Sequence, residues 1–187
     1  LIEDLKELEI LEAFAESSGK YAVVNAVIED FTEIALLLLE HNFPLLENPS
    51  NNIRTALHQV IMNENEVLTK VLLEKGASVN TPDKKGETAV HAVAALRNPR
   101  IFELVMQHQP DLFATNSDGL CTLLSILKKP FVKWKFDMLL KWGINLDVKI
   151  QYPKLSTDKV GEFSKITLFE AALREDNIQA AKMILQA

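Results

Sequence analysis

Two histidines occupy the same place in a four-residue phrase that the chain repeats. Thr55-Ala56-Leu57-His58 returns 33 positions later as Thr88-Ala89-Val90-His91. Paired imidazoles can ligate a metal. Equivalent side chains in neighbouring units of a repeat also recur simply because the fold repeats them. We therefore expect structural roles for His58 and His91, and we predict neither a bound metal nor a cofactor.

The rest of the chain offers little for catalysis. Its single cysteine, Cys121, excludes an internal disulfide framework, and no cluster of cysteine and histidine has the spacing of a zinc site. No glycine-rich loop resembles a phosphate cradle, and no nucleophile has an evident base. We expect Cys121 to be a small buried residue rather than a reactive thiol. The sequence thus predicts that the protein is not an enzyme.

Four lysines alternate with two aromatic side chains between residues 128 and 135. The run is Lys128-Lys129-Pro130-Phe131-Val132-Lys133-Trp134-Lys135. Basic charge beside an exposed aromatic can hold phosphate and stack a base, as in proteins that bind single strands. In the other interpretation, which we favour, Phe131 and Trp134 share one face of a helix and pack between repeat units while the lysines face water.

Stacked pairs of helices are needed to position these residues. Gly86 returns as Gly119 at the same interval of 33 residues. A repeat of this length is one supersecondary unit, which buries its apolar face only against its neighbours. Thr88 precedes an apolar segment and can cap a helix, whereas Gly76 follows an apolar run and suits a left-handed helix stop. Each unit is therefore expected to be two helices and a turn.

The same residues resemble the ankyrin repeat, whose pattern runs D-x-x-G-x-T-P-L-H-x-A-A and, after a loop, V-V-x-L-L-L-x-x-G-A-D-V-N. The match rests on Asp83, Gly86, Thr88, Val90 and His91 at the opening of one unit, and on Val71-Leu72-Leu73, Gly76-Ala77 and Val79-Asn80 at the close of another. The resemblance implies an all-α solenoid of helix-turn-helix units joined by hairpin-like fingers. It also implies that the histidine of the phrase bonds backbone between units.

The resemblance covers about residues 20–187 and describes a single ankyrin-repeat domain. We expect an N-terminal capping helix at 1–16, a diverged repeat at 17–49, repeats at 50–82, 83–115 and 116–147, an inserted long finger at 148–165, and an incomplete repeat at 166–187. The capping helix is amphipathic, with Leu5, Leu8 and Leu11 on one face. The long finger is polar, and it either binds a partner or is a tolerated insertion.

Partners of ankyrin repeats usually meet the finger tips and the exposed side of the first helices. The resemblance therefore implies a concave surface for a protein or peptide partner. Its expected residues are Asn52, Arg54, Lys84, Lys85, Glu87, Ser117, Asp118 and Leu120 on the fingers, with Met62, Asn63, Ala95, Leu96, Lys128 and Lys129 on the helices. Trp142 at the rim is an expected hot spot, and Tyr152 is the aromatic of the long finger.

Charge is distributed unevenly along the chain. Residues 1–50 hold eleven acids and two lysines, a balance of −9, whereas residues 128–165 hold nine lysines and four acids, a balance of +5. Two interpretations stand: chance clustering on a solvated surface, or ends that attract different partner surfaces. No apolar stretch approaches 18 residues, so no membrane insertion is expected.

The leading functional hypothesis is a rigid protein-interaction module within a larger intracellular protein, either cytoplasmic or nuclear. The alternative is recognition of RNA or an oligonucleotide through Lys128 to Lys135, which rising salt would weaken steeply. The chain starts at Leu1 and stops at Ala187 inside a second helix. We expect an excised domain, whose apolar C-terminal end meets further repeats or a second copy of the chain in a homodimer.

Overall fold

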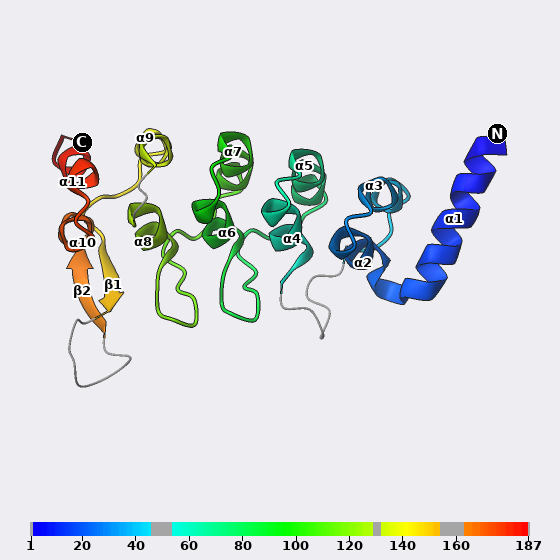
Figure 1. Ribbon diagram of the computed structural model, residues 1–187, viewed down its shortest axis with the longest axis horizontal. Coiled ribbons are helices and arrows are strands. Elements are labelled where there is room, and N and C mark those ends of the chain that lie inside the picture. The colour runs from blue at the N-terminus through cyan, green and yellow to red at the C-terminus, as the bar shows by residue number, and fades with distance from the viewer. Residues whose placement is uncertain (1, 46–53, 129–131, 154–162, 187) are drawn as a thin grey trace.

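The computed structural model describes residues 2–45, 54–128, 132–153 and 163–186. Within these ranges, pairs of helices form an elongated stack, and a β-hairpin precedes the last pair (Figure 1). In chain order the elements are α1 (Ile2–Ser18), the 3-10 helix η1 (Gly19–Tyr21), α2 (Ala22–Ile28), α3 (Thr32–Glu40), α4 (Ala56–Met62), α5 (Glu66–Glu74), α6 (Ala89–Ala95), α7 (Pro99–Gln107), α8 (Thr122–Leu127), α9 (Lys133–Lys141), β1 (Lys149–Pro153), β2 (Phe163–Thr167), α10 (Leu168–Arg174) and α11 (Ile178–Gln186).

The helices form two layers. The first helices of the pairs, α2, α4, α6, α8 and α10, contact one another in sequence, and the second helices lie beside them in a parallel row (Figure 1). The connecting fingers extend from the first-helix layer, away from the second helices (Figure 1). This arrangement confirms the expected ankyrin solenoid. The all-α class needs one addition, which is the hairpin of β1 and β2.

Capping residues fix where the helices begin. Threonine precedes α4 and α6, and the Thr55 hydroxyl accepts a hydrogen bond from the His58 amide at 3.3 Å. Asparagine precedes the second helices α5 and α7, and the Asn65 side chain accepts from the Leu68 amide at 3.0 Å. A side-chain oxygen at this position satisfies an amide that the helix itself leaves unpaired. The expected helix-capping role of threonine is confirmed.

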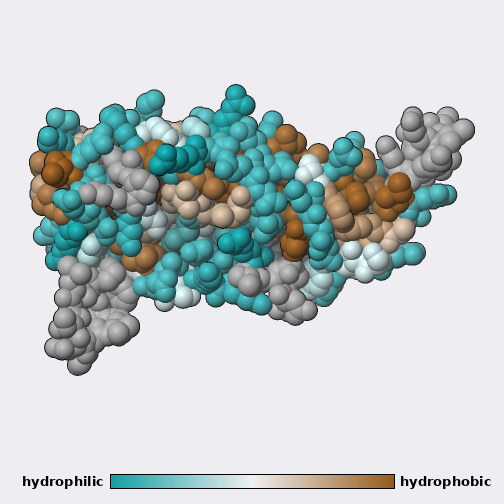
Figure 2. Space-filling view, viewed as in Figure 1, coloured by the Kyte–Doolittle hydropathy of each residue, from teal (hydrophilic) through white to brown (hydrophobic). Residues whose placement is uncertain are grey.

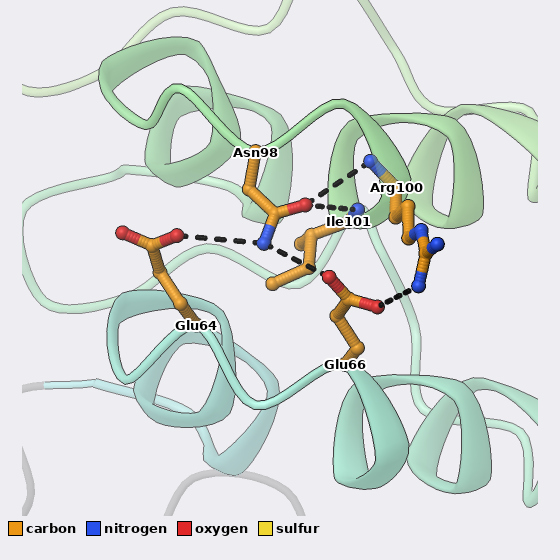
Figure 3. Close-up of polar contacts among 5 residues, drawn as sticks. All are labelled: Glu64, Glu66, Asn98, Arg100 and Ile101. Carbon is orange, nitrogen blue, oxygen red and sulfur yellow. Dashed lines mark hydrogen bonds and ion pairs between the residues drawn. The ribbon is translucent and has the colours of Figure 1, made fainter.

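Side-chain hydrogen bonds tie equivalent positions of successive pairs together. Three of them join residues 33 apart: Asn63 to Asp30 at 3.3 Å, Asn65 to Thr32 at 3.0 Å, and Lys75 to Asn42 at 3.2 Å. Figure 3 shows the next step of this ladder, where the Asn98 amide donates to the Glu64 and Glu66 carboxylates at 3.4 and 3.2 Å. The Asn98 oxygen also accepts from the Arg100 and Ile101 amides, so one side chain both caps α7 and bonds the previous unit.

Helix α1 packs on the first end of the stack through its C-terminal half. Leu11 is buried, and the Phe14 ring meets the edge of Phe31 with 6.2 Å between centroids. Towards its N-terminus, α1 leans away from α3 (Figure 1). Helix α1 thus contacts both α2 and α3.

The described ends of the long finger are β-strands rather than loop. Strands β1 and β2 pair antiparallel with Ile150 opposite Ile166 and Gln151 opposite Lys165. Directly opposed residues share a face, and faces alternate along a strand. Ile150, Tyr152 and Ile166 are accordingly buried on one face, where the strands contact α10. Residues 154–162 lie outside the described part.

Apolar side chains are exposed at the C-terminal end. Leu173, Ile178 and Leu185 are 51, 59 and 71% exposed. Figure 2 shows hydrophobic surface at this end, next to a mostly hydrophilic flank. Among the described helices, none is both long and apolar enough to cross a membrane.

Candidate partner-binding surface

The finger before α6 ends in a tightly bonded turn. The Asp83 carboxylate accepts from the amides of Lys85 at 2.7 Å and Glu87 at 2.9 Å, while the Asp83 amide donates to the Glu87 carbonyl at 2.8 Å. Asp83 itself is buried, whereas Lys84 and Lys85 are exposed at the tip. Because one carboxylate fixes two amides, the backbone that carries both lysines has a defined shape.

The next finger repeats this turn with asparagine in place of aspartate. The Asn116 side chain accepts from the amides of Asp118 and Leu120, both at 3.0 Å. The two turns are then joined directly, because the Ser117 amide donates to the Lys85 carbonyl at 2.8 Å. We call the exposed residues Arg54, Lys84, Lys85, Ser117 and Asp118 the fingertip surface.

Gly86 is the residue that lets the two fingers approach. Its φ is +73°, and a Cβ atom there would lie 3.0 Å from the Ser117 amide nitrogen. We expect Gly143→Ala, at φ +70° with nothing within 4 Å, to lose about 1–2 kcal/mol of stability from backbone strain alone. Gly86→Ala should lose roughly 1 kcal/mol more, because the fingers must separate. Urea unfolding measures both, and equal losses would contradict the tight finger contact.

Of the two repeated histidines, His91 bonds the backbone of the next unit, as the resemblance implies, whereas the buried His58 Nε2 has no hydrogen-bond partner among the described residues. The Thr88 amide donates to His91 Nδ1 at 3.1 Å, which places the ring proton on Nε2, facing the Leu120 carbonyl of the next unit at 3.2 Å. His58 is buried beside Thr55, and burial lowers its pKa more than the nearby Asp83 carboxylate raises it. Over the described residues, no three His, Cys, Asp and Glu side chains are grouped as a metal site would require.

The ends of the first helices carry the other predicted contact residues. Met62, Ala95 and Lys128 occupy equivalent positions 33 apart at the ends of α4, α6 and α8. Met62 and Ala95 are exposed, and Lys128 is half-buried. Leu96 and Leu120, the two apolar candidates, are half-buried and pack against the core. Among the other candidates, Glu87 is half-buried, Asn63 is exposed, and Asn52 and Lys129 lie outside the described residues.

Trp142 stands apart from the fingertip surface. It ends α9, is 42% exposed, and lines a cleft of about 410 Å³ with Met106, Gln107, Gln109 and Pro110. These residues lie at the ends of the second helices α7 and α9 rather than on the fingers. Trp142 therefore remains a predicted contact, but for a partner that reaches the second-helix layer.

The structure places the Tyr152 side chain inward, against α10, rather than on an exposed contact surface. Tyr152 is only 7% exposed, and its hydroxyl donates to Glu175 Oε1 at 2.9 Å. Burial, followed by this bond, raises the pKa of Tyr152 to about 12. The side chain anchors the hairpin to α10 because alternation along β1 turns it inward.

The lysine and aromatic run does not face water as a whole, which corrects the expectation for its lysines. Lys135 is 2% exposed, and its Nζ donates to the Ala94 carbonyl at 2.6 Å. Trp134 packs edge-on against Phe102 of the preceding unit with 5.4 Å between centroids, as the packing interpretation predicts. Lys133 pairs with Asp137 at 2.7 Å on the surface. Phe131, with residues 129 and 130, lies outside the described part.

The solvent face of the hairpin was missed by the sequence interpretation. Lys149, Gln151 and Lys165 are exposed on one face, opposite the buried Ile150 and Tyr152. The signal was present, because Lys149-Ile150-Gln151-Tyr152 alternates polar and apolar residues, as a half-buried strand does.

Known proteins share this architecture. A family model described as ankyrin repeats, in three copies, matches residues 23–116. The chain is similar to the RelA-associated inhibitor of Mus musculus, with 38% identity over 72 residues, which are 38% of this chain and 9% of that protein. It is also similar to the nuclear factor NF-kappa-B p105 subunit of Gallus gallus, with 23% identity over 183 residues, covering 94% of this chain and 17% of that protein.

Among solved structures, the chain is similar to the ankyrin repeat domain of Bcl-3, described as a unique member of the IkappaB protein family. The TM-score is 0.65 at 20% sequence identity, over 88% of this chain and 70% of that one. A likeness at this identity shows the shared fold. The chain spans less than a fifth of the length of either curated relative.

Proposed function

Because the chain belongs to the ankyrin-repeat family, we propose that it is a protein-interaction module whose fingertip surface holds a protein or peptide partner. The observation that carries this proposal is the backbone hydrogen bond from Ser117 to Lys85, which joins two fingers. The buried Asp83 fixes the turn of one finger, and the half-buried Asn116 fixes the turn of the other. These bonds support a finger backbone that has one shape before a partner arrives. Less conformational entropy is then lost on binding, so a modest set of contacts can give useful affinity.

The names of two relatives support a choice of partner to test. One curated relative is by name associated with RelA, and another is a subunit of NF-kappa-B. We therefore propose RelA as the first partner to test, with the chain acting as a binding module rather than an enzyme, in the cytoplasm or the nucleus. A homodimer through Ile178 and Leu185 is a separate prediction, which sedimentation of the chain alone would test.

Charge reversal on the fingertip surface tests the proposal. We expect Lys84→Glu/Lys85→Glu to weaken binding of purified RelA by at least about tenfold, which corresponds to roughly 1.4 kcal/mol. The matched control is Lys70→Glu/Lys182→Glu, which reverses two exposed lysines on the second helices α5 and α11. Biolayer interferometry measures both. Equal affinities for the two variants would exclude the fingertip surface, and no binding of wild type would exclude RelA.

Nucleic-acid recognition finds little support in the described surface. It needs several free lysines beside an exposed aromatic. Here Lys135 is buried, Lys133 is paired with Asp137, and Trp134 packs against Phe102. We expect no salt-sensitive binding of a single-stranded oligonucleotide between 50 and 200 mM salt, a range over which several phosphate contacts would change affinity markedly.

A further inference from the structure

The row of bonded fingers is interrupted after the second of the two turns. The turns at Asp83 and Asn116 are joined by a backbone hydrogen bond. The next element is the β-hairpin, whose sheet holds only β1 and β2 among the described residues. In Figure 1, β1 lies on the α8 side of β2 and faces the finger that precedes α8. No described backbone hydrogen bond joins that finger to β1. One edge of β1 is therefore open.

A cleft of about 360 Å³ lies between the finger before α8 and β1. One wall is the base of the finger, with Phe113, Thr115 and Cys121. The other is Val148 and the first three residues of β1, Lys149 to Gln151, with Lys165 of β2 beside them. Phe113 is 41% exposed, so the cleft has an accessible apolar surface. An unpaired strand edge next to an apolar pocket is the arrangement by which proteins add an extended peptide to a sheet.

The charges around the cleft point to the kind of peptide. Lys149 and Lys165 both line it and are exposed on the same face of the hairpin. None of the described residues that line the cleft is acidic. Two cations without a carboxylate between them favour a ligand that carries negative charge. Phe113 is the one aromatic among the described lining residues, which is too few to stack successive bases, so a peptide fits better than a nucleic acid.

We propose that the cleft between the finger before α8 and strand β1 binds an acidic peptide in extended conformation. The peptide adds as a strand to the open edge of β1. Its carboxylates meet Lys149 and Lys165, and one of the apolar side chains that alternate with them contacts Phe113. This site is separate from the fingertip surface, and it gives the inserted finger a binding role of its own.

A synthetic peptide tests the site on the whole chain. The probe is acetyl-EVEIEV-amide, which alternates acidic and β-branched residues, titrated into ¹⁵N-labelled protein. We expect saturable shifts of the Lys149, Ile150 and Gln151 amides. Lys149→Glu/Lys165→Glu should weaken binding by at least about tenfold. The milder Lys149→Gln/Lys165→Gln should weaken it less, and it serves as the test variant if the double reversal does not fold.

Controls separate this proposal from the proposed function. The same peptide N-methylated at alternate residues cannot complete the strand pairing and should not bind, nor should acetyl-KVKIKV-amide. Lys84→Glu/Lys85→Glu should bind the probe as wild type does, whatever its effect on RelA. The proposal is overturned by the absence of saturable shifts, by shifts confined to the fingertip surface, or by a ten-nucleotide oligo-dT that binds the β1 amides more tightly than the peptide.

Discussion

Phe102→Ala lowers the free energy of unfolding by about 3–5 kcal/mol, the expected cost of removing a fully buried phenylalanine. Phe102 has no exposed surface, and its ring meets Trp134 of the next unit edge-on at 5.4 Å. The equivalent positions of α3 and α5 hold the smaller Ala35 and Thr69. The equivalent position of α9 holds Phe136, which is also fully buried. Because the Phe102 ring packs on Trp134, its removal leaves a cavity between α7 and α9.

Urea unfolding followed by circular dichroism measures this loss. Tryptophan fluorescence in a Trp142→Phe background gives a second readout, because the Trp134 indole loses its packing partner and should emit at longer wavelength. The control is Val67→Ala on α5, where the side chain is 60% exposed and the expected change is within about 0.5 kcal/mol. A loss below 1 kcal/mol for Phe102→Ala would show that α7 and α9 do not pack as described.

Lys135 should make the free energy of unfolding rise with pH in the alkaline range. Burial, with a smaller effect of Arg97, lowers the pKa of Lys135 from 10.5 to about 8 in the folded protein. In the unfolded chain the same lysine titrates near 10.4. Between these values the unfolded state binds more protons than the folded state, so the free energy of unfolding rises with pH. The maximum gain is roughly 3 kcal/mol.

The substitution Lys135→Met should abolish this rise. The measurement is urea unfolding of both proteins from pH 7 to 9.5, with the difference between them plotted against pH. Taking the difference matters because the raised pKa values of Cys121 and Tyr152 act the other way: both groups hold their protons longer when folded, and their contributions fall as the pH rises past 9 and 10. A pH-independent difference would contradict the buried ammonium.

Val132 precedes α9 at the position where α5, α7 and α11 have a capping asparagine. Asn98 and Asn177 stand before α7 and α11, whereas Val132 stands before α9 and gives no side-chain cap. Asn177 donates to the Leu127 carbonyl at 2.7 Å, and the carbonyl 33 residues earlier, that of Ala94, receives Lys135 instead. Val132→Asn/Lys135→Met should reproduce the arrangement of Asn177, with a side-chain cap and a donor to the Ala94 carbonyl, and exceed wild type at pH 7 by about 1 kcal/mol or more. A double variant less stable than wild type at pH 7 would contradict the idea that Lys135 takes the place of an asparagine donor at position 132.

The sequence predicts what repeats and misses what breaks the repeat. Periodicity locates the helical pairs, the capping threonines and the histidine bond between units, because each depends on a residue type at a fixed interval. Lys135 goes wrong for the same reason: its equivalents are Ile34, Leu68 and Ile101, so the pattern assigns the position to the core, yet lysine composition alone suggests a surface. Val132 in place of asparagine does not mark the exchange by itself, because Phe31 before α3 also gives no side-chain cap and is followed by Ile34.

The candidate site divides along the same line. Fingers that follow the period present Lys84, Lys85, Ser117 and Asp118 where the pattern places them. The inserted finger has no counterpart in the other units, so the period predicts neither its strand pairing nor the burial of Tyr152. Only the local alternation of polar and apolar residues indicates both. A Cys121 in place of the capping threonine was correctly expected to be buried.

The central claim is that the fingers have one shape before any partner binds. Hydrogen exchange of the free protein tests it most directly, at the amides of Lys85, Glu87, Ser117 and Leu120, which donate within or between the two turns. We predict that these amides are protected together with those of α6 and α8. Exchange at the rate of an unstructured peptide, while α6 and α8 stay protected, would contradict the claim.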